Sequence, residues 1–340
     1  MKALVYTNTQ EMQFRDEPKP HAAADEVLLR VASTAICGSD MHAYHGLDER
    51  RVPPLILGHE VAGYVEGGEL DGQLAVVNPL MSCGHCGHCL GGRANLCAER
   101  ELIGMYLAGA YAEYVVIKRS NLLFPDRPIE PWVASLTEPT ATALHAVVQI
   151  ERCSYRPVSE LRVLVIGGGA IGLLAALILH AKGCHKVALA ETNALRRGTV
   201  SAQKISGVPV AQVFDPLSEA VPNSTEYDVV IDCVGSGATR RMASAQVVAG
   251  GILSHVGLQD SNEGLDTRRL TLQEVTFLGN YCYTHADMKA SLDMLAQGRL
   301  GDLAWVETRA LSEGAEAFAD LHNGKVAAAK IVLEPTVECG

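Results

Sequence analysis

The sequence has few basic residues for its length. Lysine and arginine number 28, against 39 aspartate and glutamate residues, and the formal net charge at pH 7 is -11. Binding to nucleic acid needs clustered lysine and arginine that displace counterions from phosphate, and an anionic membrane surface attracts the same kind of cluster. We therefore expect neither nucleic acid nor a membrane among the partners of this chain.

Long hydrophobic runs are also missing. Residues 163–179 are apolar overall, but four glycines interrupt them and a strand pattern gives way there to a helix pattern, which disfavours a membrane span. The first six residues form a short apolar run without a basic leader or a long apolar core, which predicts no export signal. We expect a cytoplasmic protein whose ten cysteines stay reduced and favour metal binding over disulfides.

Length and composition predict two domains. The chain has 340 residues, more than one hydrophobic core usually holds, with 48% hydrophobic and 20% charged residues. Roughly the first 135 residues contain short apolar or alternating runs separated by Gly, Pro and Asp, which predicts a β-rich domain. These runs are residues 27–31, 61–65, 74–77 and 112–117.

From residue 161 onward, strands are expected to alternate with helices. A strand at 161–166, a helix at 170–182 and a strand at 186–190 predict a parallel sheet with helices on both faces. Further strands are expected at 228–234, 251–256 and 275–281. The C-terminal part is expected to hold amphipathic helices at 287–297 and 313–321 and a closing strand at 330–333. We expect that last strand to return to the N-terminal domain.

Four closely spaced cysteines indicate a structural metal site. Their spacing is C-x2-C-x2-C-x7-C, with glycines between or beside them that let the backbone wrap around an ion. Four thiolates close a tetrahedron around zinc and leave no open position, so the site has a structural role. His85 and His88 are competing ligands, and a redox-sensing cluster is the alternative function. The cysteines are Cys83, Cys86, Cys89 and Cys97.

A second set of potential ligands is dispersed along the chain. It consists of Cys37, the pair His59 and Glu60, and Glu138. One thiolate, one imidazole and one carboxylate would leave a fourth position open for water or a substrate oxygen, as in a catalytic zinc site. Taken singly, these residues are equally compatible with a buried thiol, a core histidine and a carboxylate at a helix start.

A glycine-rich turn predicts dinucleotide binding. The aliphatic strand at 163–166 leads into G-x-G-x-x-G, formed by Gly167, Gly169 and Gly172, and then into a helix. Gly167 permits the turn, Gly169 lets the backbone approach a pyrophosphate, and Gly172 allows close helix packing. Ala170 and Ile171 begin the helix, whose N-terminus offers unpaired N–H groups to the anion.

Glu191 is expected to select the cofactor. It stands 19 residues after Gly172, at the end of the next strand. Its carboxylate can accept hydrogen bonds from the adenosine ribose and would repel a 2′-phosphate, which favours NAD over NADP. Arg196 and Arg197 follow closely and partly offset that repulsion, although a solvated helix face is the alternative for both.

Taken in their order along the chain, from Cys37 through His59, the four-cysteine lobe and Glu138 to the glycine-rich turn, the motifs resemble the medium-chain zinc-dependent alcohol and polyol dehydrogenases. Glu138 followed by Pro139 is most similar to the sorbitol and threonine dehydrogenase branch. The resemblance implies an α/β protein with a GroES-like, β-rich catalytic domain and a Rossmann domain built on a doubly wound parallel sheet. The catalytic domain, with the structural zinc lobe, would comprise residues 1–144 and 284–340, and the NAD-binding domain residues 145–283. NAD and two zinc ions, one catalytic and one structural, are the implied cofactors.

The resemblance also implies roles for single residues. Cys37 and His59 would bind the catalytic zinc, and the family leaves open whether Glu60 or Glu138 is the direct carboxylate ligand. Asp40 would accept a hydrogen bond from His59 and so fix its orientation.

Four further residues are assigned to the transfer of the substrate proton or to the cofactor cleft. Ser39 and His42 are candidate proton-relay groups, with a plain surface histidine as the alternative for His42. By resemblance, Val234 and Val256 line the cofactor cleft, with Val256 near the nicotinamide.

The expected activity is oxidation of a secondary alcohol, polyol or sugar-acid hydroxyl to a ketone by hydride transfer to NAD, in a homodimer or homotetramer. The polyol branch usually carries an arginine near residues 275–284, and residues 279–284 contain none, which disfavours sorbitol and leaves smaller alcohols, sugar acids and amino alcohols. Two other functions compete with this one. One is a zinc-free reductase on the same scaffold. The other is a nucleotide-binding redox sensor that is stabilised by zinc and has no dehydrogenase turnover.

Overall fold

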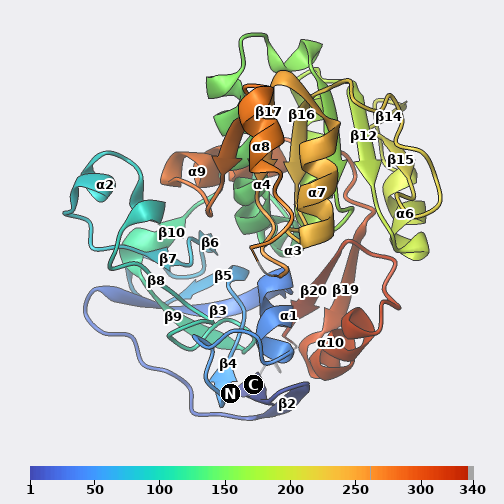
Figure 1. Ribbon diagram of the computed structural model, residues 1–340. Helices are drawn as coiled ribbons and strands as arrows, with labels where there is room; N and C mark the ends of the chain where they lie inside the picture. Colours follow the sequence, from blue (N-terminus) through green and yellow to red (C-terminus); the bar gives the residue numbers. More distant parts are fainter. Residues whose placement is uncertain (261, 336–340) are drawn as a thin grey trace.

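The computed structural model describes residues 1–260 and 262–335 and contains two large sheets (Figure 1). The last five residues of the predicted catalytic domain, 336–340, lie outside the described residues. In Figure 1 the β-rich part lies at the bottom and the α/β part at the top, with a small lobe around helix α2 (Gly87–Leu90) projecting to one side.

The β-rich part is built on a seven-stranded sheet in the order β10-β6-β5-β3-β20-β19, with β9 also paired to β3. Its strands are β3 (Glu26–Ala35), β5 (Glu60–Glu66), β6 (Leu74–Val77), β9 (Tyr114–Lys118), β10 (Leu122–Leu123), β19 (Val306–Ala310) and β20 (Lys330–Glu334). A three-stranded sheet of β1 (Lys2–Asn8), β2 (Glu11–Asp16) and β4 (Leu55–Ile56) lies in the same part. The prediction that the closing strand returns is confirmed, because β20 pairs antiparallel with β3.

The α/β part is a six-stranded parallel sheet in the order β15-β12-β11-β16-β17-β18. Numbered within the sheet, this is the order 3-2-1-4-5-6 of a doubly wound fold, with the switch point between β11 and β16. The strands are β11 (Arg162–Ile166), β12 (Lys186–Ala190), β15 (Gln212–Phe214), β16 (Tyr227–Asp232), β17 (Val247–His255) and β18 (Thr276–Gly279). The parallel sheet is confirmed. Strand β15 was not predicted, because three residues in a polar setting give no periodic signal.

Helices cover both sheets and connect them. They are α1 (Gly38–Tyr44), α3 (Pro131–Ala134), α4 (Thr137–Cys153), α5 (Ala170–Ala181), α6 (Ala194–Ser201), α7 (Gly237–Gln246), α8 (Thr267–Leu272), α9 (His285–Ala296) and α10 (Gly314–His322).

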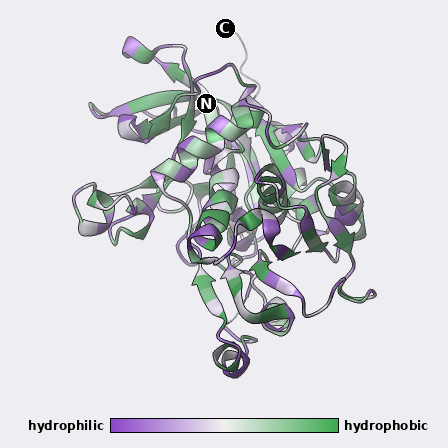
Figure 2. Cartoon of the chain, turned by 90° about the horizontal axis from the view of Figure 1, so that it is seen from above, coloured by the Kyte–Doolittle hydropathy of each residue, from purple (hydrophilic) through white to green (hydrophobic). Residues whose placement is uncertain are grey.

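The predicted domain boundary after residue 144 falls inside α4, whose buried Leu144 and Val147 share one core with Leu173 of α5. The division into two domains therefore stays a prediction. Figure 2 shows mainly hydrophobic colour on strands of the sheets.

The small lobe joins the two parts. It carries α2 and the 3-10 helix η2 (Ala94–Leu96), next to the strand pair β7 (Leu80–Met81) and β8 (Glu101–Leu102). A last pair, β13 (Lys204–Ile205) and β14 (Val208–Pro209), forms a hairpin elsewhere. Asn95 of the lobe donates a hydrogen bond to the Tyr281 carbonyl oxygen after β18 (2.9 Å), which fixes the lobe against the α/β part. None of the described helices is long and apolar enough for a membrane crossing.

Candidate active site

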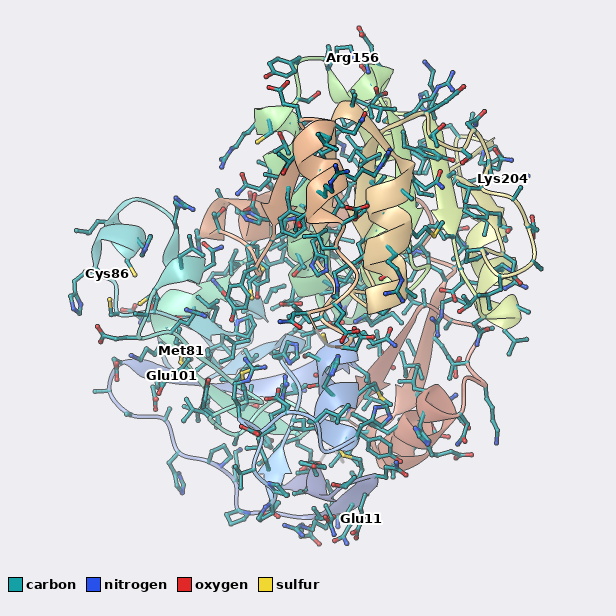
Figure 3. All side chains as sticks on the ribbon, viewed as in Figure 1. Glu11, Met81, Cys86, Glu101, Arg156 and Lys204 are labelled. Carbon is teal, nitrogen blue, oxygen red and sulfur yellow. The ribbon has the colours of Figure 1, made fainter. Side chains whose placement is uncertain are left out.

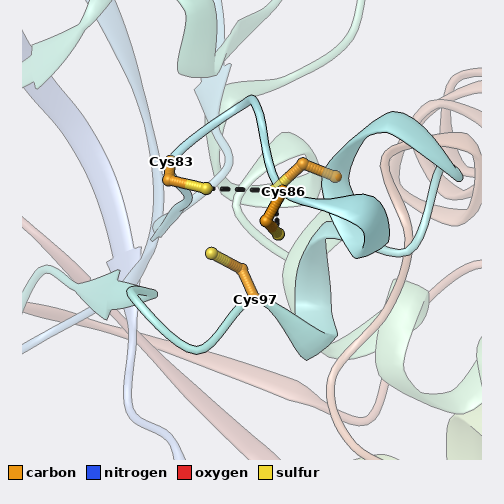
Figure 4. Close-up of side chains that lie close together, drawn as sticks. Cys83, Cys86 and Cys97 are labelled. Carbon is orange, nitrogen blue, oxygen red and sulfur yellow. Dashed lines mark hydrogen bonds between the residues drawn. The ribbon is translucent and has the colours of Figure 1, made fainter.

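The four predicted lobe cysteines lie together (Figure 4). Their sulfur atoms are all within 4.8 Å of one another, with 3.5 Å between Cys86 and Cys89 and 3.9 Å between Cys83 and Cys89. A tetrahedron of sulfurs at 2.3 Å from zinc has edges of about 3.8 Å. The donor set therefore fits a structural zinc ion. His85 instead contacts the Cys83 carbonyl oxygen through Nδ1 (2.8 Å).

Cys37, His59 and Glu60 form a second group whose potential ligand atoms lie within 4.8 Å of one another. Cys37 is the N-cap of α1, and His59 and Glu60 stand at the start of β5, so paired secondary structure fixes both segments. Burial, and then the Glu60 carboxylate, raises the pKa of the Cys37 thiol. A thiolate at this position consequently needs a cation beside it, and a metal ion fits that requirement.

Glu60 is held by a lysine that the sequence analysis missed. The buried Lys330 ammonium donates to both Glu60 carboxylate oxygens (2.7 and 2.8 Å) and to the Ile36 carbonyl oxygen (2.9 Å). Burial alone would lower the pKa of Lys330, but Glu60 and Cys37 outweigh it and raise the pKa. The pairing leaves Glu60 less available to a metal. The only sequence signal was a lysine that opens an otherwise apolar strand.

Glu138 lies near this group but outside it. It is buried in the first turn of α4 and is not one of the three residues that the described part of the chain brings within 4.8 Å. Burial raises its pKa to about 7. The buried Tyr283 faces Glu138, and burial followed by this carboxyl raises the Tyr283 pKa well above its usual value.

Asp40 lies behind His59. One of its oxygens, Oδ2, accepts hydrogen bonds from the Cys37 N–H (3.1 Å) and the Tyr111 hydroxyl (2.6 Å). The other, Oδ1, lies 3.5 Å from His59 Nδ1, and among the described residues neither atom has a hydrogen-bond partner. Buried polar atoms of this kind normally have a hydrogen-bond partner. A small closure between them would give the predicted hydrogen bond from His59 to Asp40.

Ser39 is held by a second residue that the sequence analysis missed, Arg51. The Arg51 side chain is fully buried and donates to Ser39 Oγ (3.1 Å), the Ser39 carbonyl oxygen (3.2 Å) and the Gly104 carbonyl oxygen (2.9 Å). Arg51 forms ion pairs with Asp48 (2.5 Å) and with Asp40 Oδ1 (3.6 Å). His42 lies half-buried in the same helix, three residues after Ser39. The run Asp-Glu-Arg-Arg at residues 48–51 carries no sequence signal of burial.

The glycine-rich turn lies at the switch point of the parallel sheet. Gly167 has a φ of +100°, and a Cβ there would lie 2.6 Å from Val234 Cγ2, at the end of β16. A Cβ on Gly172 would lie 1.9 Å from the Gly167 carbonyl oxygen, so only glycine permits this packing of α5. Gly169, the N-cap of α5, faces open space, and the half-exposed Ala170 and Ile171 follow it. The N-terminus of α5 is thus accessible to an anion.

Glu191 lies beside this turn, at the end of β12. Its carboxylate accepts hydrogen bonds from the Gly168 N–H (2.9 Å) and the Asn193 N–H (2.7 Å), and Arg196 Nη1 is 3.4 Å away. Arg197 donates to the Glu191 and Thr192 carbonyl oxygens and pairs with Asp215. Both arginines therefore make specific contacts rather than only a solvated face.

Val234 and Val256 follow β16 and β17 at the same edge of the sheet. A fully buried Asp232, not predicted from the sequence, accepts from the Val234 and Gly235 N–H groups (3.0 and 2.9 Å). The Val256 N–H donates to the Asp232 carbonyl oxygen (2.9 Å). Asp232 thus fixes both turns around the switch point.

Comparison with known proteins agrees with this geometry. Residues 23–126 match the alcohol dehydrogenase GroES-like domain, and residues 170–297 match the zinc-binding dehydrogenase family. The chain is 30% identical over 308 residues to L-galactonate-5-dehydrogenase of Escherichia coli, covering 88% of each. It is also 30% identical over 313 residues to sorbitol dehydrogenase of Bacillus subtilis, covering 88% of this chain and 86% of the relative.

A solved structure shares the fold over its whole length. It is a zinc-binding dehydrogenase of Sinorhizobium meliloti bound to NADP, with a TM-score of 0.83 and 26% identity, and it covers 98% of this chain and 99% of its own. The chain belongs to the medium-chain zinc-dependent alcohol and polyol dehydrogenase family. It is a dehydrogenase acting on CH–OH donors, with NAD and zinc as its cofactors.

Proposed function

We propose that this dehydrogenase oxidises a secondary hydroxyl group of a polyol, a sugar acid or a related alcohol to a ketone. The observation that carries the proposal is the convergence of Cys37, His59 and Glu60 within 4.8 Å of one another. Bound there, a zinc ion would supply Lewis acidity to the substrate hydroxyl group. The proposal includes NAD in the crevice at the switch point, where the C-terminal ends of β11 and β16 meet.

Each residue of the group has a proposed task. Cys37 and His59 hold the zinc ion, and Asp40 orients His59 through Nδ1, which leaves the other ring nitrogen for the metal. Glu60 stays paired with Lys330 and acts as an outer carboxylate, whereas Glu138 is the carboxylate still able to approach the metal.

Ser39 and His42 are the proposed path for the released proton. Arg51 donates to one lone pair of Ser39 Oγ, so the hydroxyl can accept a proton on its other lone pair and pass its own toward His42. Because Arg51 is buried and held by Asp48 and Gly104, it keeps Ser39 in one orientation.

The cofactor proposal assigns the pyrophosphate to Gly167, Gly169, Ala170, Ile171 and Gly172. Gly169 faces open space at the start of α5, where the N–H groups of Gly169, Ala170 and Ile171 would meet the anion, while Gly167 and Gly172 shape the turn. Val234 and Val256 line the nicotinamide side of the crevice, and Arg196 lies at the ribose side with Glu191.

Glu191→Ala should weaken NAD binding about 10- to 100-fold, since hydrogen bonds to a charged group contribute about 1.5 to 3 kcal/mol. Loss of the negative charge should also relax the discrimination against NADP. Kd values for both cofactors, measured by calorimetry, check this. The control is Glu160→Ala, which removes an exposed carboxylate from the same part of the chain. An unchanged NAD to NADP ratio would refute the role of Glu191.

The activity itself is tested with a panel of secondary alcohols, polyols, sugar acids and amino alcohols, each offered with NAD. Reduced-nicotinamide absorbance should rise with at least one class, and zinc analysis should give two ions per chain. One zinc ion per chain without turnover would favour a nucleotide-binding sensor, and none would favour a zinc-free reductase; both would contradict the proposal.

The remaining proposals concern organisation. We infer a catalytic domain of residues 1–144 and 284–340 and an NAD-binding domain of residues 145–283, supported by the two separate large sheets. A homodimer or homotetramer follows the usual symmetry of soluble oligomers. A cytoplasmic location is supported by the nine described cysteines, none of which forms a disulfide.

A further inference from the structure

Arg100 is a half-buried cation without a carboxylate partner in the described part of the chain. It follows the last lobe cysteine, and its Nη1 donates to the Cys97 carbonyl oxygen (2.8 Å). Its Nε donates to the Tyr281 hydroxyl (3.2 Å), and the guanidinium carbon lies 4.7 Å from the centre of that ring. These contacts use two of its five N–H groups. The outer edge of the guanidinium remains available to a ligand.

The neighbouring carboxylates do not neutralise Arg100. Glu99 lies with Cys83 and His85, within 4.8 Å of their donor atoms, and Glu101 belongs to strand β8. No described carboxylate oxygen is within ion-pair distance of Arg100. A half-buried charge without a counterion is unfavourable, which favours binding of an anion from outside.

Arg100 is close to the catalytic group. It contacts Tyr281, while Tyr283, two residues later, faces Glu138, and residues two apart along the chain are separated by at most about 7 Å. Cys282 lies between them. Burial raises the pKa of its thiol to about 12; Glu138 adds to this effect and Arg100 opposes it, so both charges act on one side chain.

A second guanidinium, that of Arg50, also lies near Tyr281. Arg50 precedes the buried Arg51, which contacts Ser39, and Arg50 acts electrostatically on Tyr106 and Tyr281. However, both oxygens of Asp48 accept hydrogen bonds from Arg50 (2.8 and 3.0 Å), and Arg50 shares this carboxylate with Arg51. Of these two guanidinium groups, Arg100 is the one without a carboxylate contact among the described residues.

There is room for a ligand beside Arg100. Arg100 and Tyr106 line an open hollow of about 520 Å³, whose other charged residues are Glu99, Glu101 and Lys118. Met81 and Glu101 of this hollow are labelled in Figure 3, next to the lobe that carries Cys86. The chain as a whole has a net charge of -11, and Asp40, Glu60 and Glu138 are close to the catalytic group. A cation beside the hollow therefore favours the entry of a negatively charged substrate.

We propose that Arg100 binds the carboxylate of the substrate, so that the substrate is a hydroxy acid of the sugar-acid class. The planar guanidinium presents paired N–H groups that match the two oxygens of a carboxylate. This inference rests on the dehydrogenase activity proposed above and names the substrate of that same site.

The experiment compares hexonates with the hexitols of the same configuration, which differ only in the terminal carboxylate. Steady-state kinetics with NAD are measured for the wild type, Arg100→Gln and Arg100→Lys. The matched control is Arg93→Gln, which removes the same charge from an exposed position in the same lobe. Binding of each hexonate to the NAD-bound enzyme is measured separately by calorimetry.

We expect kcat/KM to favour a hexonate over its hexitol. Arg100→Gln should lower the hexonate value about 10- to 100-fold, mainly through KM, and weaken hexonate binding to a similar extent. The hexitol values and the Arg93→Gln enzyme should change by no more than about twofold. Arg100→Lys should be intermediate, since it keeps the charge but loses the paired donors.

Three results would each contradict one part of the proposal: the subsite, the carboxylate or the dehydrogenase activity. Equal losses on hexonate and hexitol in Arg100→Gln would overturn the subsite and leave the dehydrogenase function standing. A preference for a hexitol phosphate over the hexonate would overturn the carboxylate assignment. Hexonate binding that depends on Arg100, without oxidation of any alcohol, would support the subsite and contradict the proposed activity.

Discussion

Cys37→Ala and His59→Ala should each lower kcat by a factor of about 1,000 or more. Each change removes a donor to the catalytic zinc, whose Lewis acidity is worth several kcal/mol of barrier, and about 4 kcal/mol corresponds to a factor of 1,000. The NAD crevice lies on a different set of strands, so NAD affinity should stay within about twofold of the wild type. The measurements are NADH formation, NAD binding by calorimetry and zinc content per chain.

Zinc content separates the two metal sites in the same variants. Either change should reduce the content from two ions to one, because the four lobe cysteines are untouched. Cys153→Ala is the matched control, since it removes an exposed cysteine at the end of α4 and should leave kcat unchanged. Residual activity above a few per cent in the Cys37 or His59 variants would mean that the assigned ligands are wrong.

Lys330→Met should destabilise the protein by about 3 to 5 kcal/mol. Removing the ammonium leaves Glu60 fully buried without its counterion, and breaking a buried ion pair on one side has a cost of this size. Strand β20 also pairs with β3 next to Cys37, so the loss falls on the segment that holds the metal site. Denaturant unfolding followed by circular dichroism measures the effect.

The double variant Lys330→Met with Glu60→Gln tests the reason for that loss. If the uncompensated charge is the cause, neutralising Glu60 should recover more than half of the lost free energy of unfolding. A single-variant loss below about 1 kcal/mol, or a double variant less stable than the single one, would contradict the pairing and reopen Glu60 as a direct zinc ligand.

The local motif predicted the strand, glycine turn and helix at residues 163–182 well. Gly167, Gly169 and Gly172 lie in one turn, whose geometry depends on contacts within a few residues and on one neighbouring strand. The strand and helix patterns gave element positions within a few residues; for example, the helix expected at 287–297 spans His285–Ala296. Such positions can be read from the sequence because apolar and polar residues alternate along a helix or strand with the period of that element.

Charged partners across the chain could not be predicted in this way. Lys330 meets Glu60 from 270 residues away, and Arg100 meets Tyr281 from 181 residues away. These contacts depend on how β20 enters the sheet and how the lobe lies against the loop after β18. Arg51 is closer to Ser39 in sequence, but its run of charged neighbours resembles a solvated loop and hides its burial.

The most direct test of the central claim is an anomalous difference map, recorded just above the zinc absorption edge from crystals grown with zinc. The account predicts two peaks in each chain, one among Cys83, Cys86, Cys89 and Cys97 and one between Cys37 and His59. A peak at the lobe alone, with Cys37 and His59 turned away from each other, would contradict it.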